Sequence, residues 1–148
     1  MHTRFLDNLF EEFSSEIAII WKNQEHTYGS LIEKIEKCKY FLNSNEIPSG
    51  AVVAIIGDFS PNSIALLFAL IEKNCIIVPL TKKSRNNHIR FFSIAEVEFI
   101  IHVDLKDIIS SETTSKKSNN DYYNSIRKKD PPGLVLFTSG TSGKPKAA

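Results

Sequence analysis

The 148-residue sequence has few cysteines, a small net charge and no apolar run long enough for a membrane span. Its two cysteines, Cys38 and Cys75, fit neither a disulfide framework nor a metal-ligand spacing, which favours a reducing, cytoplasmic setting. The net charge of +1 gives no field that would attract nucleic acid or an anionic membrane surface. These absences argue against a secreted disulfide scaffold and against nucleic acid as a partner.

Further absences concern membranes and metals. Residues 64–71 are wholly apolar, but a stretch of eight residues cannot span a bilayer. Residues 1–7 contain no apolar core of a secretory signal peptide. The sequence also predicts no metal site, because its histidines lie far apart without a metal-binding spacing. These are His2, His26, His88 and His102.

The sequence does contain an alternation of apolar runs and amphipathic segments. Hydrophobic residues make up 42% and charged residues 24%, which is typical of a soluble globular domain. The apolar runs at 51–56 and 75–80 predict strands in the interior of a parallel sheet, and residues 97–102 predict a third core strand. Ser60 is placed to cap a helix from Pro61 to about residue 74, and Ser84 to cap a helix over 85–95. This order predicts right-handed βαβ units, so the fold class is α/β with a mostly parallel sheet.

The first fifty residues predict a helix over 4–14, a strand over 17–21, a polar turn over 22–25 and a helix over 28–43. Thr27 is placed to cap the second of these helices. Its apolar residues keep the helical period, and Cys38 lies on that apolar face. This position favours a packing role for the thiol over a nucleophilic one.

The composition of the chain changes after residue 109. Residues 110–120 contain no apolar side chain and predict a mobile segment, and residues 121–130 predict one or two helical turns. We therefore expect an α/β subdomain over 1–109, a polar mobile linker over 110–130, and a strand with a loop over 131–148.

The last fifteen residues carry the main functional signal. The apolar run Leu134–Phe137 predicts a short buried strand, which leads directly into the polar segment Thr138–Lys146. Glycines let backbone N–H groups converge on an anion, hydroxyls add donors, and lysine adds a mobile positive charge. This combination predicts a phosphate-binding loop. Its members are Thr138, Ser139, Gly140, Thr141, Ser142, Gly143, Lys144 and Lys146.

This loop does not follow the Walker A pattern of P-loop ATPases. That pattern requires a glycine at the position of Thr138 and a serine or threonine directly after Lys144, where this sequence has Pro145. Proline also disfavours a helix that continues from the lysine. The sequence therefore predicts a strand–loop–strand element, with a flexible Gly/Ser/Thr connector as the alternative interpretation.

The segment Phe137–Lys146, FTSGTSGKPK, closely resembles the phosphate-binding signature of the AMP-forming adenylating enzymes. This superfamily includes acyl-CoA synthetases, the adenylation domains of nonribosomal peptide synthetases, and luciferase. Ser142 stands where the family has a second threonine, and Ala147 where it has a glycine. Weaker resemblances occur in the family's order at Thr27–Leu31, Asn74–Leu80 and Asp130–Pro131. The likeness thus covers the chain from about Trp21 to its end.

The resemblance implies the N-terminal portion of such an enzyme, ending just after the phosphate-binding loop. It also implies ATP and Mg²⁺ as cofactors, a small carboxylic acid as substrate, and CoA or a carrier protein as thiol acceptor. The family's adenine and acyl pockets, magnesium-binding glutamate and catalytic lysine lie downstream of this loop. No catalytic residue and no metal ligand is therefore assigned. The sequence ends two residues after Lys146, where the return strand is expected to begin.

Two other classes of function stay open on the sequence alone. One is a non-catalytic remnant, or a module that keeps the fold in order to bind a partner. The other is an unrelated NTPase-like nucleotide-binding domain, against which Pro145 counts. Because no acyl-pocket residue is present, the sequence does not identify the carboxylic acid.

Overall fold

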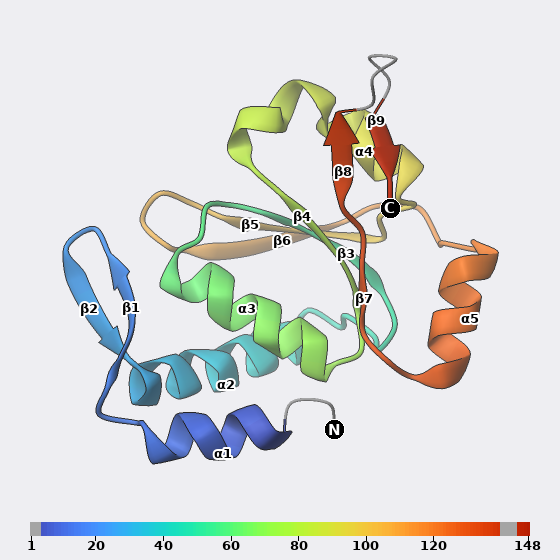
Figure 1. The fold of residues 1–148 in the computed structure, drawn as a ribbon. Helices are drawn as coiled ribbons and strands as arrows, with labels where there is room; N and C mark the ends of the chain where they lie inside the picture. The colour runs from blue at the N-terminus through green and yellow to red at the C-terminus, as the bar shows by residue number, and fades with distance from the viewer. Residues whose placement is uncertain (1–3, 140–144) are drawn as a thin grey trace.

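The computed structural model describes residues 4–139 and 145–148, and its centre is a five-stranded sheet in the order β6-β5-β3-β4-β7 (Figure 1). Strands β4 and β5 pair in parallel with β3, β7 pairs in parallel with β4, and β6 pairs antiparallel with β5. The predicted α/β class with a mostly parallel sheet is therefore confirmed. The strands are β3 (Val52–Ile56), β4 (Ile76–Leu80), β5 (Phe99–Val103), β6 (Ile109–Thr113) and β7 (Gly133–Leu134).

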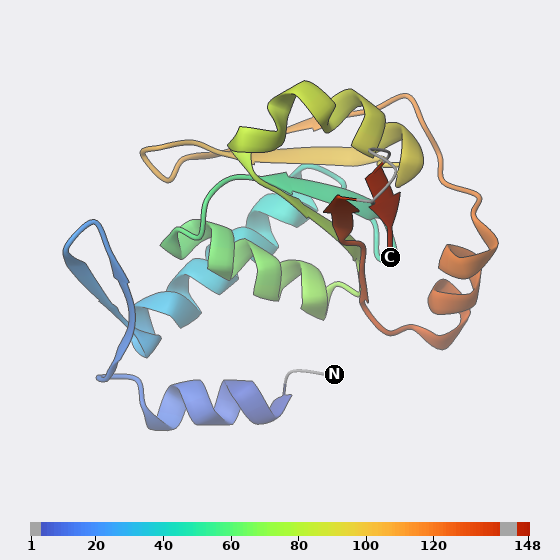
Figure 2. The same cartoon turned by 45° about the horizontal axis from the view of Figure 1, so that its top comes forward.

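Helices cover both faces of this sheet (Figure 2). Successive side chains of a strand point to opposite faces, and all five residues of β3 are buried. Val53 and Ile55 belong to the core shared with α2 (Tyr28–Ser44) and α3 (Pro61–Glu72). Val52 and Ala54 belong to the core shared with α4 (His88–Ile94). The apolar run at 51–56 is thus continuous because it is buried from both sides.

The predicted N-caps of α2 and α3 are both present. The Thr27 hydroxyl accepts a hydrogen bond from the Ser30 N–H at 3.2 Å, and the Ser60 hydroxyl accepts one from the Ser63 N–H at 3.4 Å. These bonds satisfy backbone donors that a helix leaves unpaired in its first turn. The carboxylate of Asp107 also accepts the Asn62 N–H, at 3.0 Å. It thereby ties the start of α3 to the turn between β5 and β6.

The amino-terminal residues form α1 (Arg4–Glu12) and an antiparallel hairpin of β1 (Ile17–Trp21) and β2 (Gln24–Thr27). The expected polar turn over 22–25 is therefore too long. Only Lys22 and Asn23 form it, with φ of 51° and 61°. The sequence QEHT of β2 has no apolar alternation, which explains why the strand pattern missed it.

The segment after β4 differs from the predicted helix over 85–95. It forms a 3₁₀ helix, η1 (Lys82–Asn87), and α4 begins only at His88. The predicted cap by Ser84 is wrong, because its hydroxyl donates to the Thr81 carbonyl at 2.7 Å and lies 3.0 Å from Nε2 of His88. A serine that bonds to a nearby carbonyl in this way is not available to cap a helix.

Residues 110–130 contain more regular structure than their composition predicts, although the helical turns expected in 121–130 are present. Strand β6 lies at the edge of the sheet, and α5 (Asp121–Lys129) follows it, capped by the side chain of Asn120. Tyr123 of α5 is buried, and its hydroxyl donates to the Ala95 carbonyl at 3.0 Å. The predicted mobile linker is therefore wrong where β6 and α5 form regular structure. The division of the chain into subdomains stays a prediction.

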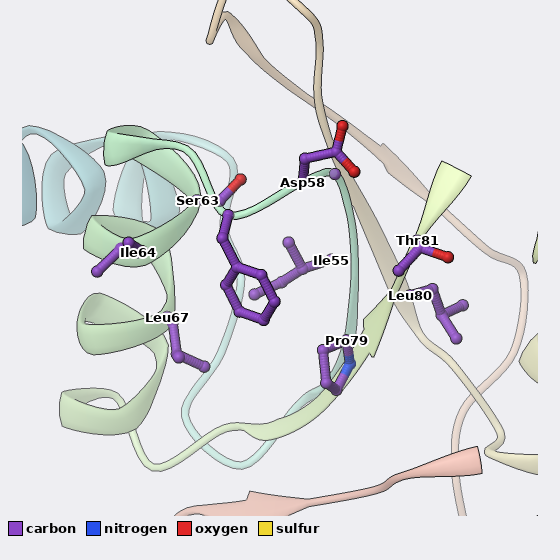
Figure 3. Close-up of a pocket in the computed structure, with 10 residues that line it drawn as sticks. Ile55, Asp58, Ser63, Ile64, Leu67, Pro79, Leu80 and Thr81 are labelled. Carbon is purple, nitrogen blue, oxygen red and sulfur yellow. The ribbon is translucent and has the colours of Figure 1, made fainter. Parts of the chain in front are cut away.

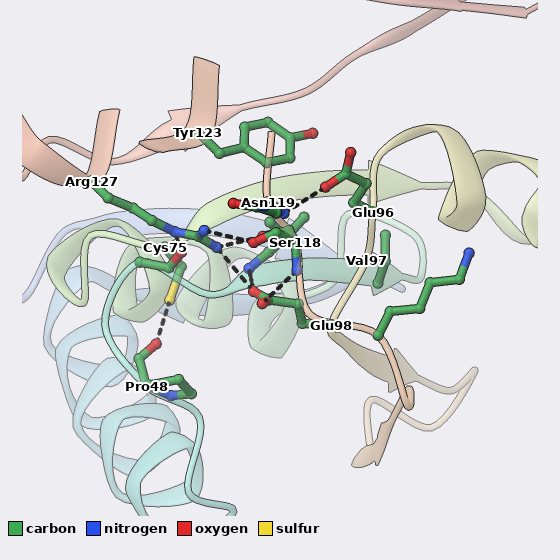
Figure 4. A network of polar contacts seen from close by, with 12 residues as sticks. Pro48, Cys75, Glu96, Val97, Glu98, Ser118, Asn119, Tyr123 and Arg127 are labelled. Carbon is green, nitrogen blue, oxygen red and sulfur yellow. Dashed lines mark hydrogen bonds and ion pairs between the residues drawn. The ribbon is translucent and has the colours of Figure 1, made fainter. Parts of the chain in front are cut away.

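Arg127 is the centre of a polar network that holds α5 against the sheet (Figure 4). Its Nε donates to the Gly50 carbonyl at 2.9 Å, and its Nη2 donates to Ser118 Oγ at 2.6 Å and to Glu98 Oε2 at 3.2 Å. Glu98 also accepts the backbone N–H groups of Val52, at 2.8 Å, and of Ser118, at 3.0 Å. These charge-assisted bonds act together with the apolar packing of Tyr123 and Ile126 to hold α5 in place.

Candidate phosphate-binding site

The predicted phosphate-binding segment is flanked by two paired strands, β8 (Phe137–Ser139) and β9 (Pro145–Ala147) (Figure 1). They run antiparallel, with Phe137↔Ala147, Thr138↔Lys146 and Ser139↔Pro145 as partners. A strand is therefore present on each side of the loop, as predicted. The predicted buried strand over Leu134–Phe137 is wrong, because β7 ends at Leu134, β8 begins at Phe137, and Leu134 and Leu136 are exposed. The expectation that the return strand begins only beyond the sequence is wrong, because β9 already supplies three of its residues.

Thr138 and Lys146 face each other directly across this hairpin. Side chains of directly opposed residues lie on the same face of an antiparallel pair. Both residues are exposed. A hydroxyl beside an ammonium group offers hydrogen-bond donors and a positive charge, which suit the oxygens of a phosphate. The structure therefore brings these two predicted site residues together.

The remaining predicted site residues are described only in part. The backbone of Ser139 pairs with Pro145 and ends β8. Gly140, Thr141, Ser142, Gly143 and Lys144 lie outside the described residues. Their assignment to the phosphate site therefore stays a prediction.

The hairpin is joined to the central sheet through the residues between β7 and β8. The buried Val135 donates its N–H to the Ile77 carbonyl of β4 at 2.8 Å. Leu136 and Ala148 exchange two backbone hydrogen bonds, both 2.9 Å long. These bonds extend the pairing of β8 and β9 toward the sheet, so the hairpin begins where the parallel sheet ends.

One aromatic contact connects the hairpin to α4. The ring of Phe137 stacks on the ring of Phe91, with centroids 4.2 Å apart and planes 20° from parallel. Phe91 is buried in the core on the α4 face of the sheet. Because Phe137 directly precedes Thr138, this stack fixes the position of the strand that carries the first hydroxyl of the site.

Sequence reasoning missed the role of Phe91. The residue is one of two adjacent phenylalanines in a helix. A helical pattern indicates that such a side chain is buried, but it does not identify the residue that the side chain contacts. A partner on another element becomes visible only when the topology places α4 beside β8. The signal that was available is the aromatic residue at position 137, which ends an otherwise aliphatic run.

The two cysteines lie away from this site, in the core shared by α2 and α3. Both thiols are free. Burial raises the pKa of Cys38 to about 11 and the pKa of Cys75 to about 12. A thiol reacts as a nucleophile in its thiolate form, so neither group is activated. This result agrees with the packing role predicted for Cys38.

Residues 4–139 and 145–148 contain no group of three or more His, Cys, Asp or Glu side chains arranged to hold a metal ion. Within the same ranges, none of the helices is both long and apolar enough to cross a membrane. The described part of the hairpin offers a hydroxyl and an ammonium group, which fit an anion. Mg²⁺, in contrast, prefers carboxylate and other oxygen ligands.

Comparison with known proteins identifies the family of the chain. The model of the family described as "AMP-binding enzyme" matches residues 6–148. The chain belongs to the AMP-binding enzyme family. Among curated members, bacitracin synthase 2 of Bacillus licheniformis is 24% identical over 153 residues, which cover 95% of this chain and 6% of the relative. Zwittermicin A synthase ZmaJ of Bacillus cereus is 25% identical over 156 residues, which cover 95% of this chain and 30% of the relative.

Solved structures share the fold of this AMP-binding enzyme chain. The N-terminal subdomain of Klebsiella oxytoca NpsA, in complex with 3-hydroxybenzoyl-AMSN, matches with a TM-score of 0.71 at 23% identity. That match covers 97% of this chain and 39% of the NpsA subdomain. VinN in complex with 3-methylaspartate matches with a TM-score of 0.70 at 16% identity, over 97% of this chain and 45% of VinN. The chain thus has the fold of part of an adenylation N-terminal subdomain and spans less than half of these structures.

Proposed function

We propose that this chain is the N-terminal part of an ATP-dependent, AMP-forming carboxylate ligase and that its hairpin binds the phosphates of ATP. The observation that carries the proposal is the register of β8 and β9, which sets Thr138 and Lys146 side by side at the base of a glycine- and hydroxyl-rich segment. Membership of the AMP-binding enzyme family supports ATP as the nucleotide.

The roles of the site residues follow from their chemistry. The hydroxyls of Thr138, Ser139, Thr141 and Ser142, with the backbone amides around Gly140 and Gly143, hold the β- and γ-phosphates. Lys144 and Lys146 neutralise phosphate charge, with Lys144 as the mobile cation. The contribution of the chain is then to orient the triphosphate and to stabilise negative charge, which is how protein groups assist phosphoryl chemistry.

ATP fits the described part of the site, whereas Mg²⁺ finds no set of carboxylate ligands there. Bound Mg²⁺ would neutralise phosphate charge during formation of the acyl adenylate. Its ligands are proposed to lie in polypeptide beyond this chain. The catalytic residues are proposed to lie there as well, so the 148 residues alone are expected to be inactive.

The partners of the complete enzyme are also part of the proposal. We infer a small carboxylic or amino acid as substrate and a thiol of CoA or of a carrier protein as acceptor. Bacitracin synthase 2 is a peptide synthase by its name, and one matched structure is an artificially fused adenylation–PCP di-domain, NpsA-ThdA. The two buried free cysteines support a reducing, cytoplasmic location.

The isolated chain is expected to bind ATP weakly, because it offers the nucleotide a phosphate loop without the adenine pocket of the family. Isothermal titration should therefore detect no binding in the micromolar range. A micromolar dissociation constant for the 148-residue chain would contradict the proposal that the rest of the ATP site lies beyond these residues.

The reaction class is tested with a polypeptide that contains this chain and the sequence encoded after codon 148. Exchange of labelled pyrophosphate into ATP should depend on an added carboxylic acid. Lys144→Ala should abolish the exchange, and Lys128→Ala, an equal loss of charge on α5, should leave it unchanged. Exchange that persists in Lys144→Ala, or ATP hydrolysis without a carboxylic acid, would contradict the proposed function. A stop codon directly after codon 148 would favour a non-catalytic binding module.

A further inference from the structure

The carboxyl ends of β3 and β4 lie side by side at the centre of the sheet, away from the proposed phosphate site. The chain that leaves β3 enters α3 on one face of the sheet, and the chain that leaves β4 enters η1 and α4 on the other face (Figure 2). Neighbouring connections that turn to opposite faces leave a crevice between them. In open α/β sheets this point is the usual place for a ligand.

A cavity of about 250 Å³ lies at this crevice (Figure 3). Its walls come from three elements: the end of β3 with the turn after it, the half-buried side of α3, and the end of β4. The lining that matters here is aliphatic, with Ile55 from β3, Ile64 and Leu67 from α3, and Pro79 and Leu80 from β4. The cavity therefore lies on the α3 face of the switch between the two strands.

The polar groups at the rim do not face a ligand in this cavity. The carboxylate of Asp58 and the hydroxyl of Thr81 point away from Leu67 and Pro79 (Figure 3). The hydroxyl of Ser63 lies 3.0 Å from the hydroxyl of Ser60, within the α3 cap. The surface that remains for a ligand is consequently apolar.

Two exposed side chains mark the cavity as accessible. Pro79 is the one exposed residue of β4, whose other four residues are buried. Phe59, which also lines the cavity, is 83% exposed. The exposed ring of Phe59 lies beside an apolar cavity. An apolar ligand in this cavity would remove part of that ring surface from water.

We propose that this cavity binds one small, uncharged ring system, in a site separate from the β8–β9 hairpin. Its volume is below the roughly 300–1,000 Å³ of drug-sized pockets and above the roughly 150 Å³ that accommodates benzene in an apolar cavity. A single fused ring system without charge is the class of ligand that fits both limits. Phe59 is placed to contact the face or edge of such a ring.

Indole is a suitable probe, and the 148-residue chain is the protein to use. Methyl groups of Ile55, Ile64, Leu67 and Leu80 are observed in ¹H–¹³C spectra during an indole titration from micromolar to millimolar concentration. We expect saturable shifts confined to these methyls. Shifts spread over the surface, or no shift at millimolar indole, would overturn the proposal.

Matched variants on one helix locate the binding. Leu67→Phe and Ile64→Phe each place a ring in the cavity, and we expect at least a tenfold loss of indole affinity in both. Ile71→Phe adds the same ring to a half-buried position of α3 outside the lining and should leave the affinity unchanged. Spectral dispersion and thermal unfolding show which variants are folded. Because Leu67→Phe and Ile64→Phe fill the cavity independently, the test can still be made if one of them does not fold.

Other occupants are distinguished in the same samples. If a second copy of the chain fills the cavity, sedimentation will show concentration-dependent association that Phe59→Ser abolishes. That result, or equal indole affinity in Leu67→Phe, Ile64→Phe and the unmodified chain, would overturn the proposal. Because ATP plays no part in these measurements, their outcome is independent of the proposed ligase function.

Discussion

Arg127 of α5 and Glu98 at the start of β5 form an ion pair, with Nη2 3.2 Å from Oε2. The same Glu98 oxygen accepts the N–H of Val52, the first residue of β3. Arg127 also reaches the Gly50 carbonyl, so one guanidinium holds the helix to the amino ends of two neighbouring strands. Because α5 leads into β7 and then into the β8–β9 hairpin, this pair sets the path of the chain toward the proposed site.

The first prediction concerns this pair. Arg127→Met should lower the free energy of unfolding by about 2–4 kcal/mol, because it leaves the largely buried carboxylate of Glu98 without its cation. Lys128→Met, on the same helix, should change it by no more than about 0.5 kcal/mol. Urea denaturation followed by circular dichroism measures both. Equal effects of the two variants would show that the network does not stabilise the fold.

The second prediction concerns the stack of Phe91 on Phe137. Phe91→Leu keeps an apolar side chain but removes the ring contact, which contributes on the order of 1 kcal/mol. The amides of Leu136 and Ala148, which bond across the base of the hairpin, should then exchange with solvent roughly five- to tenfold faster. Phe92→Leu is the matched control on α4. Unchanged exchange in Phe91→Leu would contradict a positioning role for the stack.

The third prediction concerns the cap of α3. Asp107 accepts hydrogen bonds from the Ser60 hydroxyl and from the Asn62 N–H, and it is buried. Asp107→Ala should therefore cost about 1–3 kcal/mol of stability, because it leaves these donors unpaired. Asp58→Ala removes an exposed carboxylate from the turn that precedes α3 and should cost less than about 0.5 kcal/mol. A thermal unfolding series that ranks Asp58→Ala as the more damaging change would refute this assignment.

The fourth prediction concerns pH. Folding raises the pKa of Cys38 to about 11 and of Cys75 to about 12, so these thiols stay protonated in the folded chain at pH values where the unfolded chain ionises them. Their stabilising effect is complete below about pH 9 and is lost as the pH rises toward 11 and 12. The decline is about 1.4 kcal/mol per pH unit for each thiol that is ionised only in the unfolded state.

A double variant isolates this effect. Between pH 9 and pH 11, the stability of Cys38→Ala/Cys75→Ala should depend less on pH than that of the unmodified chain, although its stability at pH 7 is lower because of the space left in the core. Urea denaturation at several pH values gives the slope of stability against pH for each protein. Equal slopes would mean that the two thiols do not titrate differently in the folded and unfolded chains.

Sequence patterns predicted the elements that depend on local signals or on burial from both sides. The caps at Thr27 and Ser60 are contacts within one turn, and the apolar run of β3 identifies a central strand without reference to its partners. The edge strand β6 was missed, and helix α5 was predicted only as one or two helical turns, because contacts with residues far along the chain stabilise this segment. Arg127 lies 29 residues from Glu98 and 77 from Gly50, separations that no local pattern reveals.

The same distinction applies to the site. Composition alone indicated a phosphate-binding segment, and Pro145 correctly predicted a strand after it. The pairing of Thr138 with Lys146 was not predictable, because it depends on the register of the hairpin. The contact of Phe91 with Phe137 depends on the topology of the whole sheet.

The central claim, that residues 138–146 bind phosphoryl groups, is tested most directly by ¹H–¹⁵N spectra of the ¹⁵N-labelled 148-residue chain. We predict that millimolar ATP and tripolyphosphate shift the amides of residues 137–144, 146 and 147, that adenosine does not, and that Lys144→Ala removes the shifts. Equal shifts with adenosine, or ATP-dependent shifts that leave the amides of Thr138 and Lys146 unmoved, would contradict it.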